Sequence, residues 1–171
     1  MKRSEIEFMP EYFEKYINEV DDIDLSEALR KYGTELIKNY RQQLIHAGNK
    51  IYAENKWTVK EILQHLIDSE RIFCYRALAF ARKDKTNLPG FEENDYADAS
   101  DPDGRSIDEI FSDFEASRNS TIKMFESFNN EMLKNTGICN NIKISVLAIG
   151  FTIAGHTLHH LKVMHGKYFS L

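Results

Sequence analysis

Four segments of the chain repeat apolar residues every three or four positions, and this periodicity constrains the possible folds more than any other feature. In the first segment, about 25–47, six apolar residues fall on one face of a helix: Leu25, Leu29, Tyr32, Leu36, Tyr40 and Leu44. The same periodicity recurs over about 58–82, 106–128 and 145–164. Helices of similar length, each with one apolar face, predict an all-α fold, specifically a four-helix bundle.

Local signals mark where these helices begin and end. Gly48 and Gly166 are natural stops for the first and last helix. Pro10 is suited to open a short helix within an N-terminal extension, 1–23. Only 142–146 resembles a strand, and it is too isolated to predict a sheet. Three residue pairs have the spacing of a capping box: Asp24 with Glu27, Thr58 with Glu61, and Ser106 with Glu109.

The connection between the second and third helices predicts how the bundle is threaded. It spans 84–105, is rich in Asp, Gly and Pro, and could cover about 70 Å when fully extended. A connection of that length can run along the whole bundle, so the second and third helices are expected to be parallel, in an up-down-down-up order. Because long irregular loops are uncommon, this crossover loop is expected to be a functional cover or a dimer arm.

Composition limits the class of protein. At 171 residues the chain, 1–171, has the size of a single domain, and 27 acidic against 22 basic residues give a formal net charge of −5. An acidic chain without a basic stripe is not expected to bind nucleic acid. The low-charge run 144–161 is too short to cross a bilayer, so no membrane association is expected. Cys74 and Cys139 form no CxxC motif and are interpreted as core residues of a cytoplasmic protein.

Three of the six histidines are expected to face the centre of the bundle. On an ideal helix, His156 and His160 lie about 40° apart, within the apolar face of the fourth helix. His65 lies one turn after Ile62 on the second helix, and in antiparallel helices it would meet His160 at the same level. Three neutral imidazoles can bind a divalent metal ion, so these residues predict a metal site. The alternative is a set of core histidines that hydrogen-bond to nearby carbonyls.

The other histidines and the single tryptophan have structural interpretations. His46 and His165 are interpreted as residues near helix C-termini, where the helix dipole favours them. His159 is expected to pack between helices or to orient a metal ligand. Trp57 precedes the second helix and is interpreted as a hydrophobic staple rather than a binding platform.

The sequence contains no catalytic motif, and Asp68 is the candidate for a catalytic role. It lies within about 60° of His65 on the helix, close enough to orient that imidazole or a bound water. The alternative is a surface ion pair with Arg71, and Glu70 points further from His65. Three residues of the crossover loop are candidates for reaching a substrate or are simply solvated: Glu92, Asp95 and Tyr96.

The sequence resembles the DinB-like superfamily, also described as DinB/YfiT-like metalloenzymes. The resemblance rests on KWTVKEILQHLIDSERIFCYRALAFAR at 56–82 and GFTIAGHTLHHLKVMHGKY at 150–168, and LPGFEENDYA at 88–97 resembles a loop of one branch. It implies an up-down-down-up four-helix bundle, commonly a homodimer. It also implies a divalent metal held by one histidine of the second helix and two of the fourth, which here are His65, His156 and His160.

The resemblance implies a metal-dependent enzyme that acts on a small molecule. Some relatives are thiol transferases or thiol-dependent isomerases that use a low-molecular-weight thiol, and others are described only as hydrolases. An ion held by three imidazoles, with zinc or nickel expected, would activate a bound water or thiol. The rival hypothesis is a non-catalytic stress-response or binding module, with a structural metal or no metal. Coordination separates the two, because a structural site is closed and a catalytic site keeps an open position.

Overall fold

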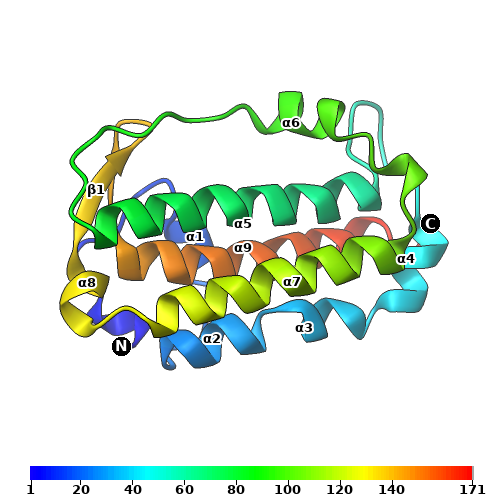
Figure 1. Cartoon of the computed structure of the whole chain (residues 1–171). Coiled ribbons are helices and arrows are strands. Elements are labelled where there is room, and N and C mark those ends of the chain that lie inside the picture. The colour runs from blue at the N-terminus through cyan, green and yellow to red at the C-terminus, as the bar shows by residue number, and fades with distance from the viewer. Residues whose placement is uncertain (171) are drawn as a thin grey trace.

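The computed structural model describes residues 1–170, most of which are helical (Figure 1). The long helices α5, α7 and α9 pack beside a row of three shorter ones, α2 to α4, and this arrangement confirms the all-α four-helix bundle. Within residues 1–170, no helix is long and apolar enough to cross a bilayer. In chain order the elements are η1 (Arg3–Glu5), α1 (Glu14–Ile17), α2 (Leu25–Lys31), α3 (Thr34–Lys38), α4 (Arg41–Ala47), α5 (Val59–Ala81), α6 (Glu93–Ser100), η2 (Pro102–Gly104), α7 (Ile107–Glu126), α8 (Asn130–Lys134), β1 (Thr136–Cys139), β2 (Ile142–Ser145) and α9 (Val146–Lys167).

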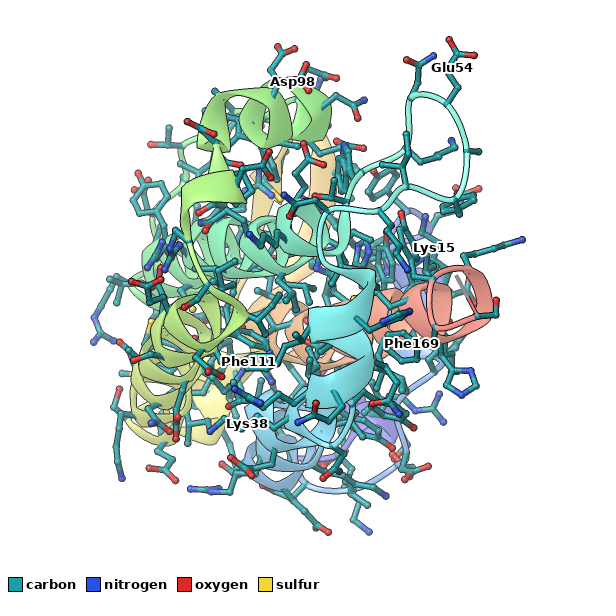
Figure 2. All side chains as sticks on the ribbon, turned by 90° about the vertical axis from the view of Figure 1, so that its right-hand side faces the viewer. Lys15, Lys38, Glu54, Asp98, Phe111 and Phe169 are labelled. Carbon is teal, nitrogen blue, oxygen red and sulfur yellow. The ribbon has the colours of Figure 1, made fainter. Side chains whose placement is uncertain are left out.

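The bundle has the threading that the long connection predicts. In Figure 1, α5 and α7 run in the same direction, whereas the α2–α4 row and α9 run in the opposite one. After α5 the chain returns along the outside of the bundle and carries α6 before it enters α7. In the end-on view of Figure 2, α6, which bears Asp98, lies on the same side of the bundle as the loop that bears Glu54. The predicted loop therefore contains an eight-residue helix that its acidic composition did not indicate.

Capping boxes set the starts of α5 and α7 as predicted. The Thr58 hydroxyl accepts a hydrogen bond from the Glu61 backbone N–H (3.2 Å), and the Glu61 carboxylate accepts one from the Thr58 N–H (2.6 Å). Ser106 and Glu109 repeat this exchange at the start of α7. Each box satisfies two N–H groups that the first helical turn leaves without partners, so these starts are determined locally.

The prediction of one continuous first helix over about 25–47 is wrong. This segment forms three shorter helices, α2, α3 and α4. Arg118 causes the first break: its Nη1 donates to the carbonyl oxygens of Leu29 and Tyr32, at 2.9 Å each. Those oxygens would otherwise accept intrahelical bonds from the next turn. At Gly33 a Cβ would lie 2.9 Å from the Leu29 oxygen, so glycine allows the close approach there. A partner from another helix thus replaces the helix's own hydrogen bonds.

The expectation that 142–146 is too isolated to form a sheet is also wrong. β2 pairs antiparallel with β1, with Thr136 opposite Ser145 and Cys139 opposite Ile142. The turn residues Asn140 and Asn141 have φ values of +50° and +61°, which a tight two-residue hairpin requires. The crossover is attached to this hairpin, since backbone hydrogen bonds join residue 88 to residues 138 and 140. The hairpin closes one end of the bundle (Figure 1).

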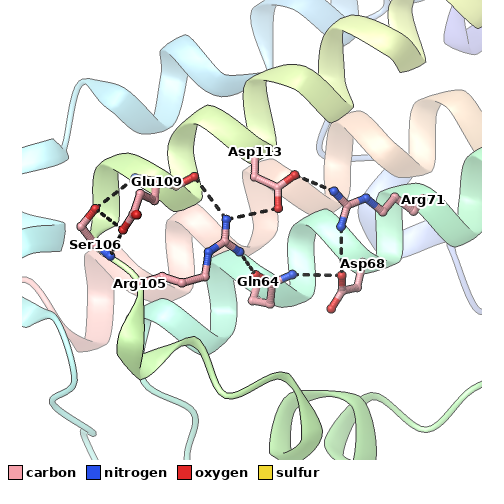
Figure 3. A network of polar contacts seen from close by, with 7 residues as sticks. All are labelled: Gln64, Asp68, Arg71, Arg105, Ser106, Glu109 and Asp113. Atoms are coloured by element: carbon pink, nitrogen blue, oxygen red, sulfur yellow. Dashed lines mark hydrogen bonds and ion pairs between the residues drawn. The ribbon is translucent and has the colours of Figure 1, made fainter.

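A network of polar side chains ties the end of the crossover to the parallel pair α5 and α7 (Figure 3). Arg105 donates to the Gln64 side chain (2.6 Å) on α5, and to the Asp113 carboxylate (3.3 Å) on α7. Asp113 also accepts a hydrogen bond from Arg71 of α5 (2.5 Å). These contacts hold the returning chain against the side of the bundle where it enters α7.

Two apolar clusters form the core, and a buried polar layer lies between them along the long helices. The layer is built on Glu70 of α5, Arg118 of α7 and Thr157 of α9, all at most 3% exposed. The Arg118 guanidinium donates to the Glu70 carboxylate at 2.8–3.1 Å and to the Thr157 hydroxyl at 2.9 Å. The candidate histidines lie at this same level of the bundle.

Candidate functional site

His65, His156 and His160 converge on one point inside the bundle. His65 comes from α5, and the other two come from successive turns of α9. The His156 Nε2 lies 3.2 Å from the His65 Nε2 and 3.0 Å from the His160 Nε2. One ring nitrogen from each of the three residues lies within 4.8 Å of the others. We refer to these three residues as the histidine cluster.

Burial keeps the histidine cluster neutral. Desolvation lowers the pKa of His65 to about 4 and that of His160 to about 3. Desolvation, reinforced by the neighbouring imidazoles, lowers the pKa of His156 well below its ordinary value. A neutral imidazole offers one nitrogen lone pair, which is the form that binds a metal ion.

Hydrogen bonds cannot pair all of the close nitrogens in the cluster. A neutral His156 Nε2 either donates or accepts, so its two close nitrogen neighbours cannot both be hydrogen-bond partners. Among residues 1–170, the Nδ1 of His160 is buried without a hydrogen-bond partner. Ser69, one turn after His65 on α5, has its hydroxyl 3.3 Å from the His65 Nδ1, where the oxygen can accept a hydrogen bond from an Nδ1–H and leave the Nε2 lone pair free. Ser69 is a functional candidate that periodicity alone did not single out.

A cavity of about 160 Å³ opens beside the histidine cluster. Aromatic side chains form much of its wall, and the Trp57 ring lies 4.7 Å from the His65 ring. Trp57 therefore lines the candidate site in addition to packing at the start of α5, where only the staple was expected. The polar part of the wall includes Arg76, Glu93 and Asn140.

Asp68 lies away from the cavity and is already bound. Its carboxylate accepts a hydrogen bond from Gln64 (3.0 Å) and forms an ion pair with Arg71 (3.6 Å), as the alternative interpretation anticipated (Figure 3). Glu70 is bound to Arg118 in the polar layer and likewise does not face the cluster.

The acidic residue of the crossover that lies at the cavity is not one of those that the sequence suggested. Glu92, Asp95 and Tyr96 are not among the residues that line it, whereas Glu93 is. The ring of Tyr96 packs instead on Phe91, with 5.0 Å between centroids. The eight residues 93–100 form a helix, and its register determines which acidic residue lies at the cavity.

The three remaining histidines do not join the cluster. His159 lies 3.6 Å from the Glu19 carboxylate and packs on the Tyr16 ring, so it sits between helices as expected. His46 is in the last turn of α4, and His165 is near the end of α9.

A four-helix bundle of this threading, with three imidazoles that converge beside a cavity, has the arrangement of a candidate metal-binding helical bundle. The chain belongs to the DinB superfamily, which it matches over residues 6–164. A solved structure with the same fold is YfiT from Bacillus subtilis, described as a probable metal-dependent hydrolase with an unusual four-helix bundle topology. It is 14% identical, the match covers 93% of this chain and 89% of that one, and the TM-score is 0.59. No curated protein matches the chain significantly.

Proposed function

We propose that the chain is a metal-dependent enzyme, in which the histidine cluster holds a divalent ion, zinc or nickel, for hydrolysis of a small molecule. The observation that carries this proposal is the convergence of three neutral imidazoles on a cavity. A purely structural site would be closed by a fourth protein ligand. Within residues 1–170 the cluster offers three ligands, which leaves a coordination position open for water or substrate. The description of YfiT as a probable metal-dependent hydrolase agrees with this proposal.

The spacing of the nitrogens fits such an ion. Zinc binds imidazole nitrogen at about 2.0–2.1 Å, and tetrahedral angles then put neighbouring nitrogens about 3.3 Å apart. The two Nε2 separations that involve His156 are 3.2 and 3.0 Å. An ion at the common point would also use the lone pairs that the three imidazoles cannot share among themselves.

When bound, the ion would supply Lewis acidity that activates a water at neutral pH. The chain's own residues would prepare the site: Ser69 orients His65, and the rings of Tyr16 and Trp57 shield the cluster from solvent. Glu93 stands on the cavity wall with a carboxylate that can accept the proton released by the nucleophile.

Transfer of a thiol is the second candidate function, and it needs a thiol from outside the chain. Burial raises the pKa of the Cys74 thiol to about 11 and also raises that of Cys139, so neither is poised as a thiolate. A low-molecular-weight thiol would then be a co-substrate. A homodimer and a cytoplasmic location remain predictions, and size-exclusion chromatography would check the first.

Elemental analysis of untagged protein tests the metal site. We expect about one zinc or nickel ion per chain in the wild type, and a loss of at least tenfold in the His156→Ala/His160→Ala variant, since two of three ligands are gone. His159→Ala is the matched control, because it removes a neighbouring imidazole outside the cluster and should leave the metal content unchanged. Equal metal content in the double variant and the wild type would refute the assignment.

Turnover then separates the candidate functions. Release of nitrophenol from a nitrophenyl ester, abolished by a chelator and restored by zinc, would support hydrolysis. Metal-dependent consumption of chlorodinitrobenzene only when a small thiol is added would support thiol transfer. A metal-loaded protein inactive in broad panels of both kinds would favour the non-catalytic module.

A further inference from the structure

The cavity beside the histidine cluster contains a buried arginine that has no acidic partner in the part of the chain that the structure describes. Arg76 of α5 is 5% exposed, and its Nη2 donates a hydrogen bond to the backbone oxygen of Pro89 (2.8 Å). Within residues 1–170, no carboxylate lies within ion-pair distance of its guanidinium. A guanidinium is always charged and carries five N–H donors, so most of the donors of Arg76 are left for something else.

Arg118 provides an internal comparison, because it is equally buried but fully paired. Its guanidinium bonds to the Glu70 carboxylate and also to backbone oxygens, including that of Leu29. Burial of a charge without a counter-ion costs free energy, so a structural arginine is expected to have such partners. Arg76 lacks them. Glu93, the acidic residue of the same cavity wall, is exposed and forms no ion pair with it.

The position of Arg76 relates it to the histidine cluster. It lies eleven residues after His65, and at 100° per residue this returns to the same face of α5 after about three turns. Long helical side chains lean towards the helix N-terminus, which directs Arg76 back towards His65. The Phe73 ring lies 5.8 Å from the Arg76 guanidinium carbon and 6.1 Å from the His156 ring, so the guanidinium and that imidazole are at most about 12 Å apart.

We propose that Arg76 binds an anionic group, a carboxylate or a phosphate, on the small molecule that reacts at the histidine cluster. The proposal rests on the proposed function, because it takes the cluster as the reacting centre. Arginine holds either group through two parallel hydrogen bonds. The Phe73 ring lies close to both the Arg76 guanidinium and the His156 ring, and Phe91 is also in the cavity wall, so the substrate class is a small organic anion with an apolar part between its charge and its reacting bond.

Ligand binding to the purified wild-type protein tests this subsite without knowledge of the reaction. Trp57 is the single tryptophan of the chain and lines the cavity, so its fluorescence reports occupancy. The probes are benzoate, phenyl phosphate, and benzamide as the uncharged counterpart of benzoate. We expect benzoate to bind at least tenfold more tightly than benzamide. In Arg76→Gln we expect the benzoate affinity to fall by about 10- to 100-fold and the benzamide affinity to stay unchanged. Whichever of benzoate and phenyl phosphate binds more tightly shows whether Arg76 prefers a carboxylate or a phosphate.

Two further variants control for charge and folding. Arg71→Gln removes an exposed positive charge from the same helix, and its benzoate affinity should equal that of the wild type. Arg76→Lys keeps the charge but loses the forked geometry, so an intermediate affinity is expected. It also serves as the second variant if Arg76→Gln does not fold, which circular dichroism and thermal unfolding would show.

The same titration in the His156→Ala/His160→Ala protein separates this proposal from the proposed function. A preference for benzoate that persists there and depends on Arg76 would support the anion subsite even if the metal assignment fails. The proposal is overturned if neither anion binds saturably, if benzoate and benzamide bind equally, or if Arg76→Gln binds benzoate as well as the wild type. The last result would place the anion at the metal instead.

Discussion

Arg118→Met is expected to lower the free energy of unfolding by about 3–5 kcal/mol, because it leaves the Glu70 carboxylate buried without its cation. The two side chains are 2% and 3% exposed, so water does not reach the carboxylate. The substitution also removes the donor that satisfies the backbone oxygens of Leu29 and Tyr32, where α2 ends. Urea unfolding followed by circular dichroism measures the loss.

Two controls identify buried charge as the cause. The Glu70→Gln/Arg118→Met variant is expected to be more stable than Arg118→Met alone, since no unpaired charge remains in the core. Arg41→Met breaks an exposed ion pair with Asp108 and should have only a small effect. If Arg118→Met and Arg41→Met unfold at the same urea concentration, the buried layer does not have the stabilising role assigned to it.

Gly155→Ala is expected to lower the free energy of unfolding by about 1–3 kcal/mol, because α9 crosses the backbone of α1 at this residue. A Cβ at Gly155 would lie 2.0 Å from the backbone oxygen of Tyr16, and backbone atoms cannot rotate away as a side chain can. Alanine favours a helix over glycine by up to about 1 kcal/mol, so a net loss of stability would have to come from the steric contact.

Gly166→Ala, on the same helix, is the matched control and should have the opposite sign. A Cβ there meets no atom of residues 1–170 within 4 Å, so helix propensity acts alone and a gain of up to about 1 kcal/mol is expected. Thermal unfolding of the two variants measures both effects. A Gly155→Ala protein that is as stable as Gly166→Ala would show that α1 does not pack against α9 as described.

Parts of the fold that depend on neighbouring residues could be predicted from the sequence. The capping boxes at Thr58 and Ser106 set the starts of α5 and α7 because both partners lie within one helical turn. The β1–β2 hairpin escaped prediction because each strand is only four residues long and its turn contains two asparagines rather than a glycine. The break after α2 could not be predicted because Arg118, which causes it, lies 86 residues further along the chain than Tyr32.

The candidate site divides in the same way. Helical periodicity was enough to predict that His65, His156 and His160 face the bundle interior at the same height along the helices. The structure brings the three residues together. Glu93 was missed because the helix that places it on the cavity wall has little apolar periodicity to indicate it. A signal for Arg76 did exist: it lies within about 20° of His65 on the same helical face, among apolar residues.

The positions of the long helices α5, α7 and α9 and the faces that they bury follow from the amino-acid sequence alone, because both depend on residues at most a few turns apart. Three features became visible only in the folded chain: Glu93 of α6 lies on the cavity wall, Arg118 interrupts the first helix, and Arg76 has no counter-ion among residues 1–170. Each of these outcomes depends on contacts between segments far apart in the chain, which no local periodicity encodes.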